Sequence, residues 1–327
     1  MNKFIDRSLL GAVVLTLFAA VCWFLPLVFL PAEPQTIINV QWMGEMVHFA
    51  ISPVWARVLQ FLLICLFGYW WRRLLVVHQL IAIKNYLPYT LFIMLVTFNA
   101  EYTQFSIQTV ILVFYMLALQ MLFRIPTGNN YTIRAMNITT LLTIAATFEP
   151  EFIYMIPLFW WGFAVFNVMS WQVFFASLLG VGGIAIVMAC LCYLCDRMDI
   201  IFHWIDNFPL PAIGEWFLPD KLSTQLFWIV FLLTVLIAVV RHAFSHLRLL
   251  QKVRLSHTYL VCLAIVLVLL RIGGILFPHG DLMIWLFLSS FLALFFAECR
   301  PRAATIGFIL FLVAEFLTFI FHLTTLQ

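Results

Sequence analysis

Four glutamates are the residues of this sequence whose type and placement could support chemistry. Glu33 and Glu45 follow the first long apolar run, and Glu149 and Glu151 flank Pro150 between two later runs. Enzymes that transfer sugars from lipid-phosphate donors use a carboxylate base, often with a divalent metal, in loops at a membrane surface. The link to such enzymes is an analogy of fold. Acidic residues also collect outside the membrane without any catalytic role, and we favour that simpler interpretation.

A second group of residues has the spacing of metal ligands. Cys190, Cys192 and Cys195 form a C-x-C-x-x-C motif, and His242 and His246 stand four residues apart. No second cysteine pair supports the first set, and no acid stands near the two histidines, for which His257 is the only other candidate ligand. We therefore expect no metal and no cofactor. The cysteines are interpreted as small apolar packing residues and the histidines as part of a solvated basic segment.

The composition indicates which solvent surrounds the chain. Of 327 residues, 65% are hydrophobic and 9% are charged, and the mean hydropathy is +1.09. Soluble domains are about 45–50% apolar and about 25% charged. The lipid bilayer is therefore the expected partner, and a membrane-protein partner is left open. A net charge of +3 without a long basic run argues against a nucleic-acid partner.

Apolar runs of about 20 residues predict membrane-spanning helices, because backbone polar groups in lipid must be satisfied within the segment. The prediction is an all-α, polytopic transmembrane helix bundle with about eleven spans in a single domain, residues 1–327. The fifth span has only about 14 residues and could form a re-entrant pair with the sixth across Glu149 and Glu151. Whether the third span crosses fully is also left open. The predicted spans are Leu9–Leu30, Pro53–Trp71, Ile83–Asn99, Ser106–Phe123, Ala135–Phe148, Phe152–Ser170, Gln172–Cys195, Thr224–Val240, Thr258–Phe277, Leu282–Ala297 and Ala303–His322.

Charge placement predicts the orientation of these spans. Lys and Arg accumulate in cytoplasmic loops, and with a cytoplasmic N-terminus the outer loops contain only Arg197 and Lys221. The acidic residues fall mostly on the other side. The pattern predicts a bacterial inner-membrane protein with a cytoplasmic N-terminus and a periplasmic C-terminus.

Two outer segments are too apolar to be free loops. Apolar residues recur near helical spacing in Ile37–Ala50, around Trp42, and again in Met198–Phe208, around Trp204. Each pattern predicts a helix lying in the outer membrane interface.

Two ionisable residues fall deep within predicted spans. Arg271 in the ninth span and Glu315 in the eleventh are predicted to lie at similar depths. A lone charge within lipid costs on the order of 3 kcal/mol, and an opposite charge offsets much of that cost. We therefore predict an intramembrane ion pair between Arg271 and Glu315, interpreted as a structural clasp.

Part of the sequence resembles a known family. The landmarks are Asn85, the stretch LALQMLFR ending at Arg124, Asn137, the acid and Pro turn at Glu149–Glu151, and Trp171 before Gly180. With the opening RSLLGAVVLTLFAAVCWFLP, they are similar to an uncharacterised family of multi-spanning inner-membrane proteins of Bacteroidota. The chain departs from the family at Met136 and in lacking a Pro soon after Gly180. The resemblance implies a bacterial cell envelope and transfers no functional residue.

Three classes of function follow from these patterns. We expect a non-catalytic inner-membrane protein, an accessory or scaffold for envelope assembly or export, because no catalytic constellation stands out among the many spans. The alternative is a periplasm-facing transferase that uses polyprenyl-phosphate-linked sugar. A transporter is the second alternative, although the two halves of the sequence show no matching interrupted helices.

Overall fold

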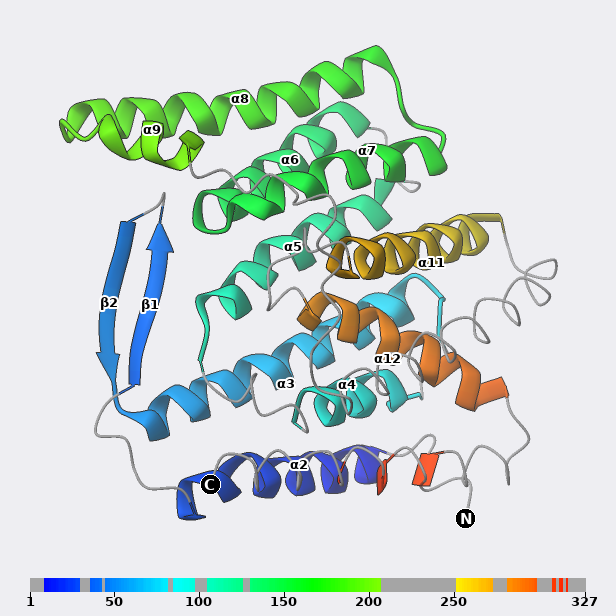
Figure 1. Ribbon diagram of the computed structural model, residues 1–327. Helices are drawn as coiled ribbons and strands as arrows, with labels where there is room; N and C mark the ends of the chain where they lie inside the picture. Colours follow the sequence, from blue (N-terminus) through cyan, green and yellow to red (C-terminus); the bar gives the residue numbers. More distant parts are fainter. Residues whose placement is uncertain are drawn as a thin grey trace.

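The computed structural model describes most of the chain as apolar helices and one β-hairpin (Figure 1). It describes residues 9–29, 36–42, 45–81, 85–97, 105–125, 130–206, 251–272 and 281–298, with residues 308, 309, 312, 313 and 316. In chain order the elements are α2 (Leu9–Phe29), β1 (Thr36–Trp42), β2 (Glu45–Ile51), α3 (Pro53–Val77), α4 (Leu87–Thr97), α5 (Ile107–Phe123), α6 (Tyr131–Phe148), the 3-10 helix η3 (Pro150–Tyr154), α7 (Met155–Val165), α8 (Trp171–Leu194), α9 (Asp199–Asp206), α11 (Gln251–Ile272) and α12 (Asp281–Glu298).

Three of the described helices are long and apolar enough to cross a membrane. They comprise α3, α8 and residues Val253–Leu270 of α11. Helices also occupy the first, third to sixth and tenth predicted spans, several of them shorter than expected. The predicted span Thr224–Val240 and nearly all of Ala303–His322 lie outside the described residues. The count of about eleven spans therefore stays a prediction.

The predicted interfacial helix at Ile37–Ala50 is wrong, because this segment is a β-hairpin. β1 and β2 pair antiparallel, with Ile38 opposite Phe49 and Val40 opposite Val47. The sequence alternates apolar and polar residues over Ile38–Trp42, and β-branched residues favour strands. In a run this short, a period of two and a period of 3.6 residues share many apolar positions, so the pattern alone does not decide between them.

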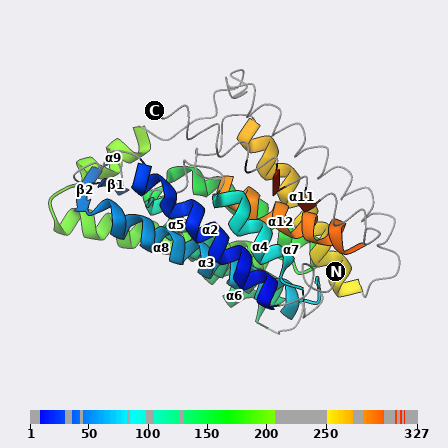
Figure 2. The ribbon, with the colours of Figure 1, turned by 90° about the horizontal axis from the view of Figure 1, so that it is seen from below.

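The second predicted interfacial segment does contain a helix. α9 folds back on the end of α8, where Ile200 is buried with Cys192, and Met188, Ile201 and Trp204 pack around them. Phe202 and Ile205 are exposed. Figures 1 and 2 both show α9 and the hairpin at the same end of the molecule. The charge pattern assigned Ile37–Ala50 and Met198–Phe208 to the same membrane face, and the described parts of both segments lie at one end of the molecule.

Residue choice at the helix ends explains several of the boundaries. Pro53 occupies the first turn of α3, where a missing N–H is tolerated, and Ser52 caps that turn by accepting from Trp55 N at 3.5 Å. Ser170 caps α8 in the same way, accepting from Val173 N at 3.3 Å. α6 stops at Phe148, because Pro150 cannot continue its hydrogen bonding.

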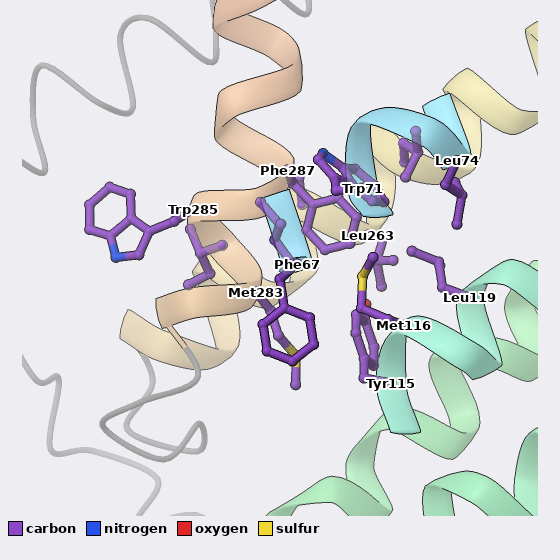
Figure 3. Packing of buried hydrophobic residues seen from close by; sticks show 14 of the residues in the cluster. Phe67, Trp71, Leu74, Tyr115, Met116, Leu119, Leu263, Met283, Trp285 and Phe287 are labelled. Carbon is purple, nitrogen blue, oxygen red and sulfur yellow. The ribbon is translucent and has the colours of Figure 1, made fainter. Parts of the chain in front are cut away.

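The centre of the core is the short helix α4. All of its residues except Tyr89 are buried, and α2, α3 and α12 contact it. Beside it, rings from three helices meet edge to face: the ring centroids of Trp71 and Phe287 are 5.3 Å apart, and those of Tyr115 and Phe287 are 6.4 Å apart. Figure 3 shows these rings near Leu263 of α11. Edge-to-face pairs add about 0.5–1.5 kcal/mol each beyond burial.

α6 and α8 approach closely around one glycine. Thr139 of α6 donates its hydroxyl to the carbonyl oxygen of Ser177 in α8 at 2.8 Å. Trp160 of α7 donates its indole N–H to Ser177 Oγ, also at 2.8 Å. A Cβ added to Gly180 would press on Thr139 Oγ1 and lie 2.5 Å from the carbonyl oxygen of Met136. The absence of a side chain at Gly180 therefore permits this three-helix junction.

We predict that Gly180→Ala destabilises the protein by about 1–3 kcal/mol, the usual cost of overpacking. The reason is that the added methyl group meets backbone, which cannot move aside as a flexible side chain would. Thermal unfolding of the detergent-solubilised protein measures the effect. Gly182→Ala is the matched control, since no atom lies within 4 Å of an added Cβ there. Equal melting temperatures for the two variants would contradict the close packing.

Candidate functional site

The structure places the candidate glutamates on two neighbouring features. Glu45 begins β2 opposite Trp42, and β1 contacts both α5 and α6. Glu149 follows α6 directly, and Glu151 lies in η3. The hairpin strand and the helix that precedes these two acids are thus in contact. Glu33 lies outside the described residues.

The joint between α6 and α7 determines how Glu149 and Glu151 are presented. Glu149 leaves the helical conformation, with φ −131° and ψ 100°, while its N–H still bonds the carbonyl of Ala145 at 3.1 Å. Its own carbonyl accepts from Phe152 N at 3.0 Å, and the Phe152 ring is fully buried. Both acids are partly exposed, although Oε2 of Glu151 is buried. The joint is a fixed turn with two carboxylates two residues apart.

The cysteine motif is divided between the two sides of one helix end. Cys192 is buried, whereas Cys190 and Cys195 are exposed, and all three are free thiols. Within the described ranges, no three His, Cys, Asp or Glu side chains gather as metal ligands. His242 and His246 lie outside those ranges, and His257 is buried in α11.

The predicted pair of Arg271 and Glu315 is not tested by the described residues. Arg271 belongs to the last turn of α11, but its side chain is not described, and Glu315 lies outside the described residues. The ion pair stays a prediction.

A basic pocket lies where α3 and α5 end. In the sequence, its arginines indicated only the orientation of the predicted spans. Its volume is about 210 Å³. Two guanidinium groups, Arg73 and Arg124, line it together with His78 and Gln120. Trp70, Leu74 and Val77 complete the lining. The sequence contains these residues as the basic ends of two predicted spans, but it does not show that the two ends adjoin.

Two hydrogen bonds hold α3 and α5 side by side. In the first halves of both helices, Gln60 Nε2 donates to Thr109 Oγ1 at 2.9 Å. Near their last turns, Trp70 Nε1 donates to Gln120 Oε1 at 3.0 Å. The two bonds are ten residues apart on α3 and eleven on α5, so the helices run parallel and their basic ends meet.

Arg72, beside the pocket residue Arg73, has a different environment. Its side chain is buried, and its Nε donates to the carbonyl oxygen of Asn85 at 3.0 Å. Its Cζ lies 3.6 Å from the centroid of the Tyr86 ring. The Asn85 side chain in turn accepts from Leu87 N at 2.9 Å. Arg72 therefore positions the segment that starts α4.

Comparison of the chain with protein-family models, curated proteins and solved structures found no match.

We predict that Arg72→Ala lowers the free energy of unfolding by about 1.5–3 kcal/mol, the value of a charge-assisted hydrogen bond. The loss would free the Asn85–Tyr86 segment and the start of α4. Chemical unfolding in detergent measures it. Arg73→Ala is the matched control, because it removes the same charge one residue away, from a side chain that is exposed. A similar loss for both variants would refute the structural role of Arg72.

Proposed function

We propose that this chain is a multi-pass protein of the bacterial inner membrane with a non-catalytic role, as an accessory or scaffold in cell-envelope assembly or export. It crosses the bilayer about eleven times, with its N-terminus in the cytoplasm and its C-terminus in the periplasm. Three helices of sufficient length and hydropathy support the membrane setting. The resemblance to Bacteroidota inner-membrane proteins supports the envelope assignment.

The observation that carries the scaffold proposal is the exposed apolar face of α8. One side of this 24-residue helix packs on α6, while Trp171, Phe175, Leu179 and Ile186 are each more than half exposed on the other. Gly182 and Gly183 have open space beyond their Cα atoms. Small residues between bulky ones let a second helix approach closely within lipid. We assign this face to a helix of a partner membrane protein.

The proposed orientation fits the excess of charge at the end of α3, which has Arg72 and Arg73 there and only Arg57 near its start. The hairpin leads directly into the start of α3, and the basic pocket is formed by its last two turns. At 1.5 Å per residue the 25 residues of α3 span roughly 37 Å, more than the hydrocarbon thickness of about 30 Å. We place the pocket on the cytoplasmic side, and the hairpin with α9 at the periplasmic interface.

Reporter fusions test this orientation. A reporter active only in the periplasm should be active when fused after Gln327 and inactive when inserted within residues 241–254. The physical reason is that basic residues in 241–254 are retained in the cytoplasm. The reverse pattern of activity would overturn the orientation.

The transferase is a second candidate, favoured by one observation. β1 contacts α5 and α6, and Glu45 pairs with Trp42 at the end of β1, so the hairpin that includes Glu45 contacts the helix that leads to Glu149 and Glu151. Carboxylates from two elements at one membrane face could serve a sugar-transfer reaction as a base. We retain the scaffold as the main proposal, because it gives the exposed α8 face a role in binding a partner helix.

We expect that the protein co-purifies in mild detergent with a membrane partner and that Gly183→Ile abolishes the co-purification. An added Cβ at Gly183 meets no other part of the chain within 4 Å, so the bulkier side chain should hold a partner helix away with little change in the melting temperature. Val14→Phe, on the exposed face of α2, is the control and should retain the partner.

The same purification distinguishes the transferase from the scaffold. Recovery of the protein alone, with activity on polyprenyl-phosphate-linked sugar, would sink the scaffold proposal. In that case Glu33, Glu45, Glu149 or Glu151 changed singly to Gln should abolish the activity in at least one variant. Wild-type behaviour of all four would exclude the transferase.

A further inference from the structure

The pocket between the last turns of α3 and α5 has the residues of an anion site. Of the seven residues that line it, none is acidic, and two carry a guanidinium group. A guanidinium matches a phosphate group with two parallel N–H donors and cannot lose its charge. His78 adds an imidazole, whose ring lies 5.4 Å from that of Phe123, centroid to centroid. The pocket therefore combines permanent positive charge with a planar donor geometry.

The hydrogen bond between Trp70 and Gln120 joins two residues of the pocket wall and orients the Gln120 amide. The indole N–H can only donate, so it holds the amide oxygen of Gln120 at 3.0 Å. The amide NH₂ group of Gln120 consequently remains a donor at the pocket wall. The two guanidinium groups and the Gln120 amide thus carry N–H donors at the cavity, which suits a ligand that accepts hydrogen bonds.

The attraction of cations to the ends of helices does not explain the positions of both arginines. Cations are attracted to the carbonyl end of a helix, but at the end of α5 another residue fills this role: Arg134 Nη1 donates to the carbonyl oxygen of Arg124. The side chain of Arg124 instead lines the pocket from α5. Arg73 lines the same pocket from α3. Two like charges that line one cavity repel each other, and an anion bound between them would reduce that repulsion.

Size and surroundings limit what can bind. A volume of about 210 Å³ is below the roughly 300–1,000 Å³ of pockets for drug-sized ligands. Val77 and Arg73 are exposed beside the pocket, and Trp70 has the indole ring that is typical of the headgroup layer. Basic pockets between helix ends on the cytoplasmic side are known to receive lipid headgroups.

We propose that the pocket lined by Arg73, His78, Gln120 and Arg124 binds one phosphate-bearing group, from an anionic lipid headgroup or from free phosphate. The site is independent of the scaffold role, although its cytoplasmic placement rests on the proposed orientation. Neither the α8 face nor the glutamates take part in it.

Binding to the purified full-length chain tests this site. The protein is placed in nanodiscs of phosphatidylcholine alone or of phosphatidylcholine with phosphatidylglycerol, and inorganic phosphate is titrated into the first set. The melting temperature should rise with at least one of the two probes, because a ligand bound only by the folded state stabilises it. A rise with phosphatidylglycerol alone identifies a lipid headgroup, and a rise with inorganic phosphate identifies a free anion.

Charge-matched variants locate the binding. Arg73→Gln and Arg124→Gln should each weaken the affinity about ten-fold, the equivalent of one charge-assisted bond. Arg197→Gln removes the same charge from the exposed α8–α9 link and should bind as wild type. Gln120→Leu is a second test, without a change of charge. It should also weaken binding, because it removes both the acceptor of the Trp70 indole and an amide donor. No stabilisation by either probe, or an equal loss in Arg197→Gln, would overturn the proposal.

Discussion

Hydrogen bonds that side chains donate from one helix to another determine how the described helices lie along one another. Within lipid, apolar side chains gain little by leaving one apolar surface for another, so helix contacts depend on packing and on such polar links. Gln60–Thr109, Trp70–Gln120 and Thr139–Ser177 join α3 to α5 and α6 to α8. Each bond contributes about 0.6–2 kcal/mol. Its larger effect is on register, because shifting one helix by a residue would separate donor from acceptor and leave both in apolar surroundings.

The short helices show the same constraint at their ends. An 11-residue helix such as α4 is only about 16 Å long, so it does not match a bilayer core of about 30 Å. Its first turn is satisfied within the protein by the Asn85 side chain, which Arg72 positions through the Asn85 carbonyl. Because α2, α3 and α12 cover it, α4 can be short without exposing its ends to lipid. The buried arginine and the short buried helix therefore depend on each other.

The helices were more predictable from the sequence than their contacts. Long apolar runs located α2, α3 and α8 closely, because length and hydropathy are properties of a single segment. The hairpin at Thr36–Ile51 was missed, since β pairing is decided by a partner strand and not by one run. The pocket was missed for a related reason. Arg73 and Arg124 are 51 residues apart, and only the parallel packing of α3 and α5 brings them together. For the glutamates, the joint after α6 was expected from Pro150, but the contact between α6 and the hairpin was not.

Arg72 and Arg73 show why a count of charges does not assign a role. Successive residues on an α-helix point about 100° apart, since 3.6 residues complete a turn. On α3 this rotation turns Arg72 into the core, toward Asn85 and Tyr86, and Arg73 toward the pocket shared with α5. Both arginines contribute equally to the charge bias that orients a membrane protein. Under the proposed orientation, this bias explains why an arginine is found at this end of α3. The neighbouring elements determine its role. The segment before α4 offers Arg72 a backbone carbonyl and an aromatic ring, whereas α5 places a second guanidinium in the pocket with Arg73, where we propose that an anion binds.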